Sequence, residues 1–74
     1  MPPVPVLSAR QVVRAFQLLS WTVARQRGSH IILVREGHRA TFSVPDTREV
    51  ARGTLRSLIR QAGLTSEEFL KVVS

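Results

Sequence analysis

The chain has 74 residues, enough for one domain with a modest core, because a domain this small buries only about 60% of its unfolded surface. Hydrophobic residues make up 43% of the chain, which argues against disorder throughout. The absence of cysteine excludes disulfides, thiol catalysis and thiolate zinc sites. The sequence has neither a signal-peptide pattern nor an apolar stretch near the roughly 18 residues that span a bilayer, so we expect a cytoplasmic protein without membrane contact.

Charge is the strongest signal in the composition. Eleven Lys and Arg residues stand against five Asp and Glu residues, which leaves a net charge of +6. Lys71 is the only lysine, so the positive charge is carried by arginine, whose planar guanidinium matches phosphate oxygens two at a time. This balance indicates an anionic partner, which is a nucleic acid, a membrane surface or an acidic protein. The alternative is a solvated basic surface that keeps the protein soluble.

The N-terminal part of the chain predicts a short lead-in and then a helix. Residues 1–7 are rich in proline, which predicts an extended lead-in, and residues 8–74 form a single domain. Ser8 and Gln11 have the spacing of a capping box, in which each side chain satisfies the other residue's backbone N–H. The helix that follows has one apolar face, formed by Val12, Val13, Phe16 and Leu19.

After the first helix the hydrophobic period changes from helical to alternating. Three segments are rich in β-branched and apolar residues, which predicts strands over 21–26, 30–35 and 39–44. We expect two-residue turns at Arg27-Gly28 and at Glu36-Gly37. Pro45 ends the third strand because proline cannot donate to a ladder.

The C-terminal part predicts a second helix. Residues 46–53 read as a polar loop, and Gly53 and Thr54 open a helix that runs to Ala62. Gly63 is placed to end that helix in the left-handed conformation.

A second capping box, formed by Thr65 and Glu68, begins a short final helix over 66–73. The predicted order is therefore α-β-β-β-α with a short extra C-terminal helix. This is an α+β fold with a three-stranded antiparallel sheet, helices on one face and the other face open. The architecture resembles that of double-stranded-RNA-binding domains, although a topology alone does not establish a function.

The two expected turns also predict which side chains the helices cover. The covered face would hold Ala24, Ile31, Leu33, Ala40, Phe42 and Val44. The open face would hold His30, Ile32 and Val34 with Thr41, Ser43, Val23 and Arg25. A slip of one residue in either pairing would exchange these assignments.

Few side chains are suited to catalysis. His30 and His38 are not accompanied by an Asp or Glu cluster, so we expect no metal site and no cofactor. The sequence has no phosphate-binding glycine loop and no nucleophilic-serine motif. Any chemistry is therefore metal-free and depends on histidine. We interpret His38 as a solvated turn residue and favour Trp21 as a core residue over a base-stacking platform.

His30 is the better catalytic candidate because of its neighbours. It follows Gly28 and Ser29 at a turn, where backbone N–H groups can approach a phosphate. Arg25 and Arg27 are close in sequence and are suited to hold a phosphodiester and stabilise its developing charge. Histidine exchanges protons near neutral pH, as acid–base catalysis requires. The alternative is an ordinary surface histidine on a strand.

A second basic element lies on the predicted C-terminal helix. Arg52, Arg56 and Arg60 recur every four residues and form one stripe along it. Thr54 stands at the start of the helix, where free backbone N–H groups can bind phosphate. We therefore include Arg52 and Thr54 among the candidate binding residues, with a plain solvated face as the alternative.

Taken together, these residues resemble the HicA toxin family over roughly residues 8 to 72. The resemblance is carried, in order, by Gly28-Ser29-His30, Val44-Pro45, Gly53-Thr54-Leu55, Ile59-Arg60-Gln61-Ala62-Gly63-Leu64 and Glu67-Glu68-Phe69. It implies a fold like that of double-stranded-RNA-binding domains and an endoribonuclease that cuts mRNA. It also implies that His30 stands at the family's catalytic position. The implied partner is a HicB antitoxin that covers the active face and makes any DNA contact itself.

These observations lead to three hypotheses. In the first, His30 removes the proton from a ribose 2′-OH while Arg25 and Arg27 position the phosphate, with Gly28, Ser29, Arg52 and Thr54 as further RNA-binding residues. The second is a non-catalytic module that holds RNA by shape. The third is a protein-interaction subunit whose open sheet face, with Ile32, Val34 and Val23, docks a partner.

Overall fold

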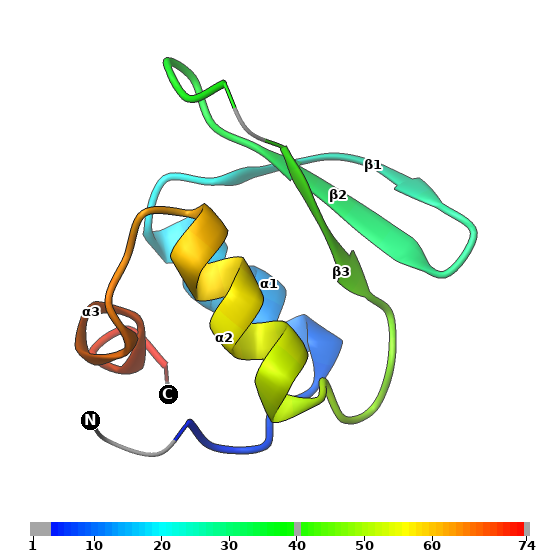
Figure 1. Cartoon of the computed structure of the whole chain (residues 1–74). Coiled ribbons are helices and arrows are strands. Elements are labelled where there is room, and N and C mark those ends of the chain that lie inside the picture. Colours follow the sequence, from blue (N-terminus) through cyan, green and yellow to red (C-terminus); the bar gives the residue numbers. More distant parts are fainter. Residues whose placement is uncertain (1–3, 40, 74) are drawn as a thin grey trace.

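The computed structural model describes residues 4–39 and 41–73, which form one sheet with helices on one side (Figure 1). The elements are α1 (Ala9–Leu18), β1 (Thr22–Arg27), β2 (His30–Val34), β3 (Phe42–Pro45), α2 (Arg52–Gln61) and α3 (Ser66–Leu70). The three strands form an antiparallel sheet in the order β1-β2-β3. The predicted α-β-β-β-α fold with a short extra helix is confirmed, although α3 ends at Leu70 rather than at residue 73. Within the described ranges, no helix is long and apolar enough to cross a membrane.

Both predicted capping boxes are present. At the start of α1, the N–H of Gln11 donates to Ser8 Oγ at 3.2 Å, and the N–H of Ser8 donates to Gln11 Oε1 at 2.9 Å. Thr65 and Glu68 repeat this pattern at the start of α3, at 3.1 and 2.9 Å. The backbone N–H and the hydroxyl of Thr65 bond to the Glu68 carboxylate and lower its pKa below the ordinary value of 4.5.

The two longer helices end in the same hydrogen-bonded motif, but different residues adopt the left-handed conformation at its end. Gly63 ends α2 at φ +75°, as predicted, and its N–H donates to the carbonyl of Arg60. Ser20 ends α1 at φ +76°, with its N–H donating to Gln17 and that of Trp21 to Phe16. A serine in the left-handed region is uncommon because its Cβ crowds the neighbouring carbonyl. The end of α1 is therefore strained where the end of α2 is not.

The core is centred on Phe16, whose side chain is fully buried. Its ring centroid lies 4.9 Å from that of Phe42 on β3, 5.1 Å from that of Phe69 on α3 and 6.4 Å from that of Trp21. Trp21 is 2% exposed, which confirms its predicted place in the core. His38 is half-buried with its ring centroid 5.0 Å from that of Trp21, so the interpretation of His38 as a solvated turn residue was wrong.

The N-terminal segment contributes to the core as well. Val4 and Leu7 are buried, at 1% and 5% exposure. Leu7 forms an isolated antiparallel bridge with Val50, whose N–H donates to the Leu7 carbonyl at 2.7 Å. Residues 4–7 therefore form an extended segment that packs against the core, a role that their proline-rich composition did not indicate. Of the predicted 1–7 lead-in, residues 1–3 lie outside the described residues.

The pairing of β2 with β3 differs from the prediction by two residues. Leu33 pairs with Phe42, whereas a tight Glu36-Gly37 turn would have paired Leu33 with residue 40, so the connection is longer than a two-residue turn. An even shift preserves side-chain faces, because the strand period is two. Phe42, Val44 and Leu33 are accordingly buried, Ile31 packs against them, and the face predicted for these four was right. Ala40, predicted for the same face, lies outside the described residues.

The pairing of β1 with β2 contradicts the prediction more deeply. The turn consists of Gly28 and Ser29 rather than Arg27 and Gly28, so Arg27 belongs to β1 and pairs with His30. A bulge between Val23 and Arg25 leaves Ala24 as the extra, unpaired residue, and Ala24 is exposed rather than covered by the helices as predicted. Val23 pairs with Leu33 and so lies on the helix side, not on the open face as predicted. Arg25 pairs with Ile32 and keeps its predicted place on the open face.

Phe16 is the residue on which the core depends most. We predict that Phe16→Ala lowers the free energy of unfolding by about 3–5 kcal/mol, as cavities from buried phenylalanines do. A domain of this length has about 4–11 kcal/mol in total, so the variant loses much of its stability. Urea denaturation followed by circular dichroism measures the change. Leu18→Ala on the same helix, at a 58%-exposed side chain, is the control and changes stability by less than about 0.5 kcal/mol. Equal losses in both variants would contradict the central place of Phe16.

The strain at the end of α1 gives a second prediction. Ser20→Gly relieves the left-handed strain and raises the free energy of unfolding by about 1 kcal/mol. Gly63→Ser is the reciprocal change, since a Cβ at Gly63 meets no atom within 4 Å and only the backbone conformation is penalised. It lowers stability by a similar amount. Thermal denaturation of both variants checks this, and an unchanged or lower melting temperature for Ser20→Gly would refute the assignment of strain.

Candidate nucleic-acid and catalytic site

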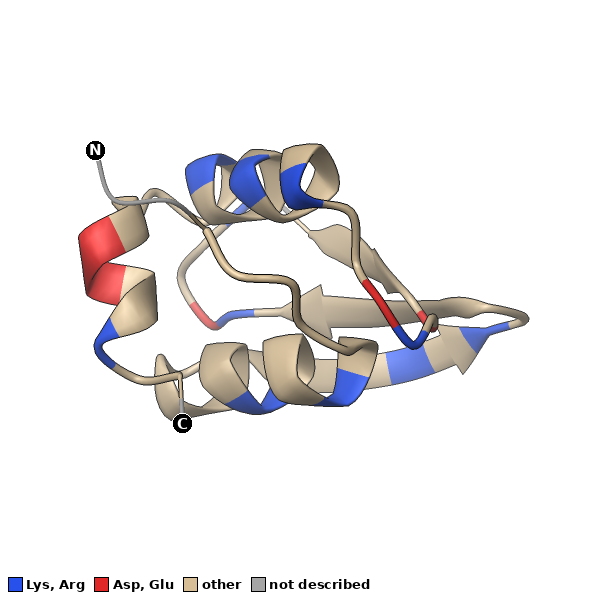
Figure 2. Ribbon diagram, turned by 90° about the horizontal axis from the view of Figure 1, so that it is seen from below, with Lys and Arg blue, Asp and Glu red and all other residues tan. Residues whose placement is uncertain are grey.

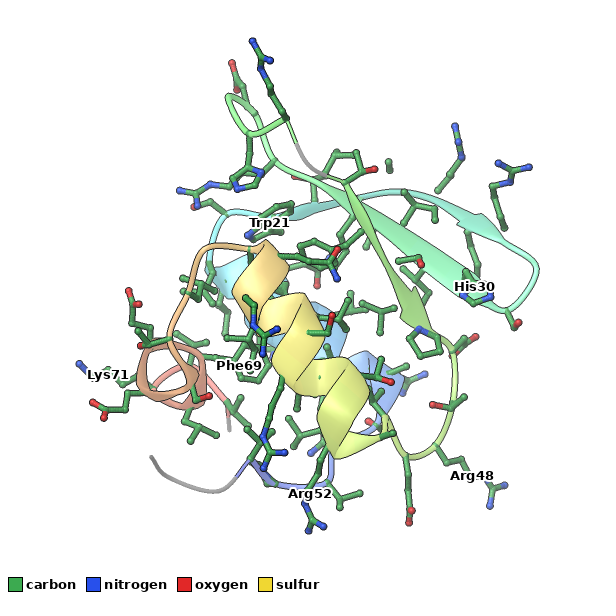
Figure 3. All side chains as sticks on the ribbon, in the orientation of Figure 1. Trp21, His30, Arg48, Arg52, Phe69 and Lys71 are labelled. Atoms are coloured by element: carbon green, nitrogen blue, oxygen red, sulfur yellow. The ribbon has the colours of Figure 1, made fainter. Side chains whose placement is uncertain are left out.

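His30 stands at one end of the sheet, at the first position of β2 (Figure 3). It pairs with Arg27 on β1 and with Pro45 on β3. Arg25 pairs with Ile32, which is two residues from His30, so both arginines share the open sheet face with the imidazole. All three side chains are exposed. The structure thus brings together the three residues that the sequence singled out for phosphate chemistry.

Hydrogen bonds to Asp46 and within the turn hold the tip of the hairpin that carries His30. Gly28 adopts φ +56°, and a positive φ at only the first of two turn residues is the pattern of a type II′ turn. The N–H of Asp46 donates to the Ser29 carbonyl at 2.7 Å and extends the β2–β3 ladder by one step. The Gln26 amide nitrogen donates to the Gly28 carbonyl at 3.3 Å and to Asp46 Oδ2 at 3.1 Å. These bonds hold the turn and His30 in place relative to β3.

The charges at this hairpin are available to a ligand. In the part of the chain that the structure describes, neither Arg25 nor Arg27 forms an ion pair, and the His30 imidazole makes no hydrogen bond. A Cβ at Gly28 would meet no atom within 4 Å, so a phosphate can approach the turn backbone from that side. The described residues contain no cluster of three or more His, Cys, Asp or Glu side chains that could hold a metal ion. The arrangement suits proton transfer beside a bound phosphodiester.

The two predicted binding residues of α2 lie elsewhere. The Nε of Arg52 donates to the Val4 carbonyl at 2.9 Å, and Figure 3 shows Arg52 well apart from His30. Thr54 is exposed in the first turn of α2, which begins one residue earlier than expected and has Ala51 as a cap without a side-chain bond. In Figure 2 the cationic positions of α2 form a group of their own, apart from those of β1. Arg52 and Thr54 therefore do not form one site with His30.

Sequence reasoning missed a groove on the other side of β1. It has a volume of about 470 Å³ and lies between α1, the first two strands and the residue after β3. Its lining includes Val13, Val23 and Ile31 with the polar side chains of Arg10, Arg14, Gln26 and Asp46. The groove depends on the bulge at Ala24 and on a hydrogen bond between residues 20 positions apart, and local patterns reveal neither.

The fold and the hairpin define a small basic domain of the double-stranded-RNA-binding-domain type, with histidine and arginine exposed on its open sheet face. Residues 9–64 match the family model described as the HicA toxin of bacterial toxin–antitoxin systems. The match extends from α1 through α2 and covers most of the chain, so the protein belongs to the HicA toxin family. No curated protein and no solved structure matches the chain.

The contact of Arg52 with Val4 yields a prediction about stability. Arg52→Met leaves the partly buried Val4 carbonyl without its charged donor and lowers the free energy of unfolding by about 1–3 kcal/mol. Arg56→Met on the same helix removes the same charge from an exposed position and changes it by less than about 0.5 kcal/mol. Urea denaturation of both variants provides the comparison. Equal effects would show that the bond to Val4 contributes no stability.

Proposed function

We propose that the protein is the toxin of a type II toxin–antitoxin pair and cleaves mRNA as a metal-independent endoribonuclease. The observation that carries this proposal is the direct pairing of Arg27 with His30, with Arg25 on the same face. An imidazole and two guanidinium groups therefore share one exposed surface, which supports proton transfer beside a bound phosphate. Membership of a toxin family supports the same conclusion.

The proposed reaction is an intramolecular transfer at phosphorus. The His30 imidazole accepts the proton of a ribose 2′-OH, and the resulting oxygen attacks the adjacent phosphate. The bond from phosphorus to the 5′-oxygen breaks, and that oxygen takes a proton from water as it leaves, giving a 2′,3′-cyclic phosphate and a 5′-hydroxyl end. Arg25 and Arg27 stabilise the negative charge that develops on the phosphate oxygens. A single general base supplies about 10²–10⁴-fold, so the enzyme is slow.

The proposed protein partner is a HicB-type antitoxin that binds the open face. Ile32 and Val34 are half-buried there beside exposed arginines, which suits a partner that combines apolar contacts with acidic side chains. Such a partner would cover His30 and neutralise the toxin. Any contact with DNA would then be made through the antitoxin.

One observation favours a second candidate function. Within the described ranges no side chain hydrogen-bonds to His30 to orient its imidazole, whereas catalytic bases are commonly held by a third group. A non-catalytic RNA-binding module with the same basic hairpin would not need such an orienting group.

Cleavage of a defined single-stranded RNA in EDTA tests the proposal. We predict that wild-type protein cuts it and that His30→Ala cuts at least about 10²-fold more slowly, because the general base is lost. Denaturing electrophoresis with a 5′-labelled RNA measures the rate, and a mobility shift shows whether the variant still binds.

DNA of the same sequence serves as the control and stays intact, since it lacks the 2′-OH. Equal cutting by both proteins, cutting of DNA, or a requirement for a divalent metal would each contradict the mechanism. Binding by both proteins without cleavage would establish the RNA-binding module instead.

A further inference from the structure

The groove between α1 and β1 has an apolar wall that the core leaves unfilled. Val23 lies on the helix side of the sheet and is nevertheless 37% exposed. It lines the groove together with Ile31 and with Val13 on α1. Every residue of β1 is exposed, whereas Leu33 of β2 and both Phe42 and Val44 of β3 are buried. A flat apolar ligand therefore finds contact surface here without displacing any core residue.

One end of the groove presents hydrogen-bond acceptors. The amide nitrogen of Gln26 is bonded to two oxygens, the Gly28 carbonyl and Asp46 Oδ2. Since both partners are acceptors, the Gln26 carbonyl oxygen and the second carboxylate oxygen of Asp46 are not used in these bonds and can accept from a ligand. Gln26 and Asp46 both line the groove. This end of the groove can therefore accept hydrogen bonds from two adjacent N–H groups of a ligand.

The rim of the groove carries positive charge. Arg10 and Arg14 lie one turn apart on α1, are exposed and line the groove. Among the residues that the structure describes, neither forms an ion pair. Figure 2 shows the cationic positions of α1 on the same side of the molecule as those of β1. The phosphates of a nucleic acid that reaches the groove can thus contact Arg10 and Arg14 on the helix side of β1, and Arg25 and Arg27 on its open face.

We propose that this groove binds one unstacked guanine base of the RNA and thereby sets where the protein cleaves. The apolar wall takes the face of the base, the acceptors of Asp46 and Gln26 receive its edge, and Arg10 and Arg14 hold the flanking phosphates. This inference rests on the proposed ribonuclease function. It adds a recognition subsite on the opposite face of β1 from His30.

Guanine is the base whose hydrogen-bonding edge fits these acceptors. Its Watson–Crick edge has two adjacent donors, N1–H and the N2 amino group, which match a carboxylate bidentately. Adenine and cytosine each offer one amino group beside a ring nitrogen that is itself an acceptor. Uracil offers one N–H between two carbonyl oxygens. Each of these three would place at least one acceptor against the acceptors of the groove.

The test uses RNA heptamers of uridine with a single guanosine placed at each position in turn. Wild-type protein is expected to cut the best-placed guanosine heptamer about 5- to 150-fold faster than all-uridine RNA, the range for one bidentate base contact. Replacing that guanosine by inosine, which lacks the N2 amino group, removes most of the preference. Asp46→Asn abolishes the preference for guanosine over inosine, because it exchanges an acceptor for an amide donor.

Glu49→Gln is the matched control, since it makes the same acid-to-amide change at an exposed residue that does not line the groove. It keeps the full preference for guanosine. Asp46→Asn retains an oxygen that accepts from Gln26, so the hairpin stays fastened. The readout for Asp46→Asn is therefore the ratio of the rates on the guanosine and inosine heptamers, because a purely structural role for Asp46 would lower the rate on every substrate equally and leave that ratio unchanged.

A binding measurement separates this inference from the proposed function. The His30→Ala protein, titrated with the fluorescently labelled guanosine and inosine heptamers, should bind the first more tightly by a similar factor. If the wild-type protein never cleaves but this binding preference is present and is lost with Asp46→Asn, the groove proposal stands and the ribonuclease proposal falls. If cleavage occurs without a preference for guanosine, or if the preference survives Asp46→Asn, the groove proposal is overturned.

Discussion

The packing of Phe16 determines how the rest of the molecule is arranged. Its ring contacts Phe42 on β3 and Phe69 on α3, and lies near Trp21 between α1 and β1. Through these contacts, one residue of α1 packs the helix against β3 and also packs α3 against α1. The buried side chains of the sheet belong to β2 and β3, whereas every residue of β1 is exposed at the edge of this core. The exposed strand that carries Arg25 and Arg27 is thus a consequence of where the core lies.

The small size of the chain explains why the N-terminal segment packs into the core. A chain of 74 residues has little apolar surface to bury, so every available apolar side chain contributes. Val4 and Leu7 extend the core under α2, and the bond from Arg52 to the Val4 carbonyl satisfies a backbone group at that edge. An arginine that composition assigns to phosphate binding is therefore partly engaged in holding the fold together. Net charge indicates a partner, but it does not say which cations face that partner.

Local signals predicted the elements well and their pairing poorly, for a physical reason. Capping boxes at Ser8 and Thr65 and the stop at Gly63 act within one helical turn, so sequence reveals them directly. Strand register depends on the turns and on packing across the sheet. The two-residue error between β2 and β3 left all the described faces right, whereas the bulge at Ala24 moved Val23 to the helix side. His30, Arg25 and Arg27 still came together because the strand alternation places them on one face on the turn side of that bulge.

The two faces of β1 have different chemistry, and this constrains how an RNA strand would bind in the proposed function. His30 and its arginines lie on the open face, whereas the groove lies on the helix side, so a single strand must cross the edge of β1 to reach both. Gln26 and Asp46 connect the two faces, because the hydrogen bonds that fasten the His30 hairpin also orient the acceptors of the groove. In the proposed function, recognition and cleavage would therefore depend on the same hydrogen bonds, and a base bound in the groove would hold its RNA strand close to the His30 hairpin.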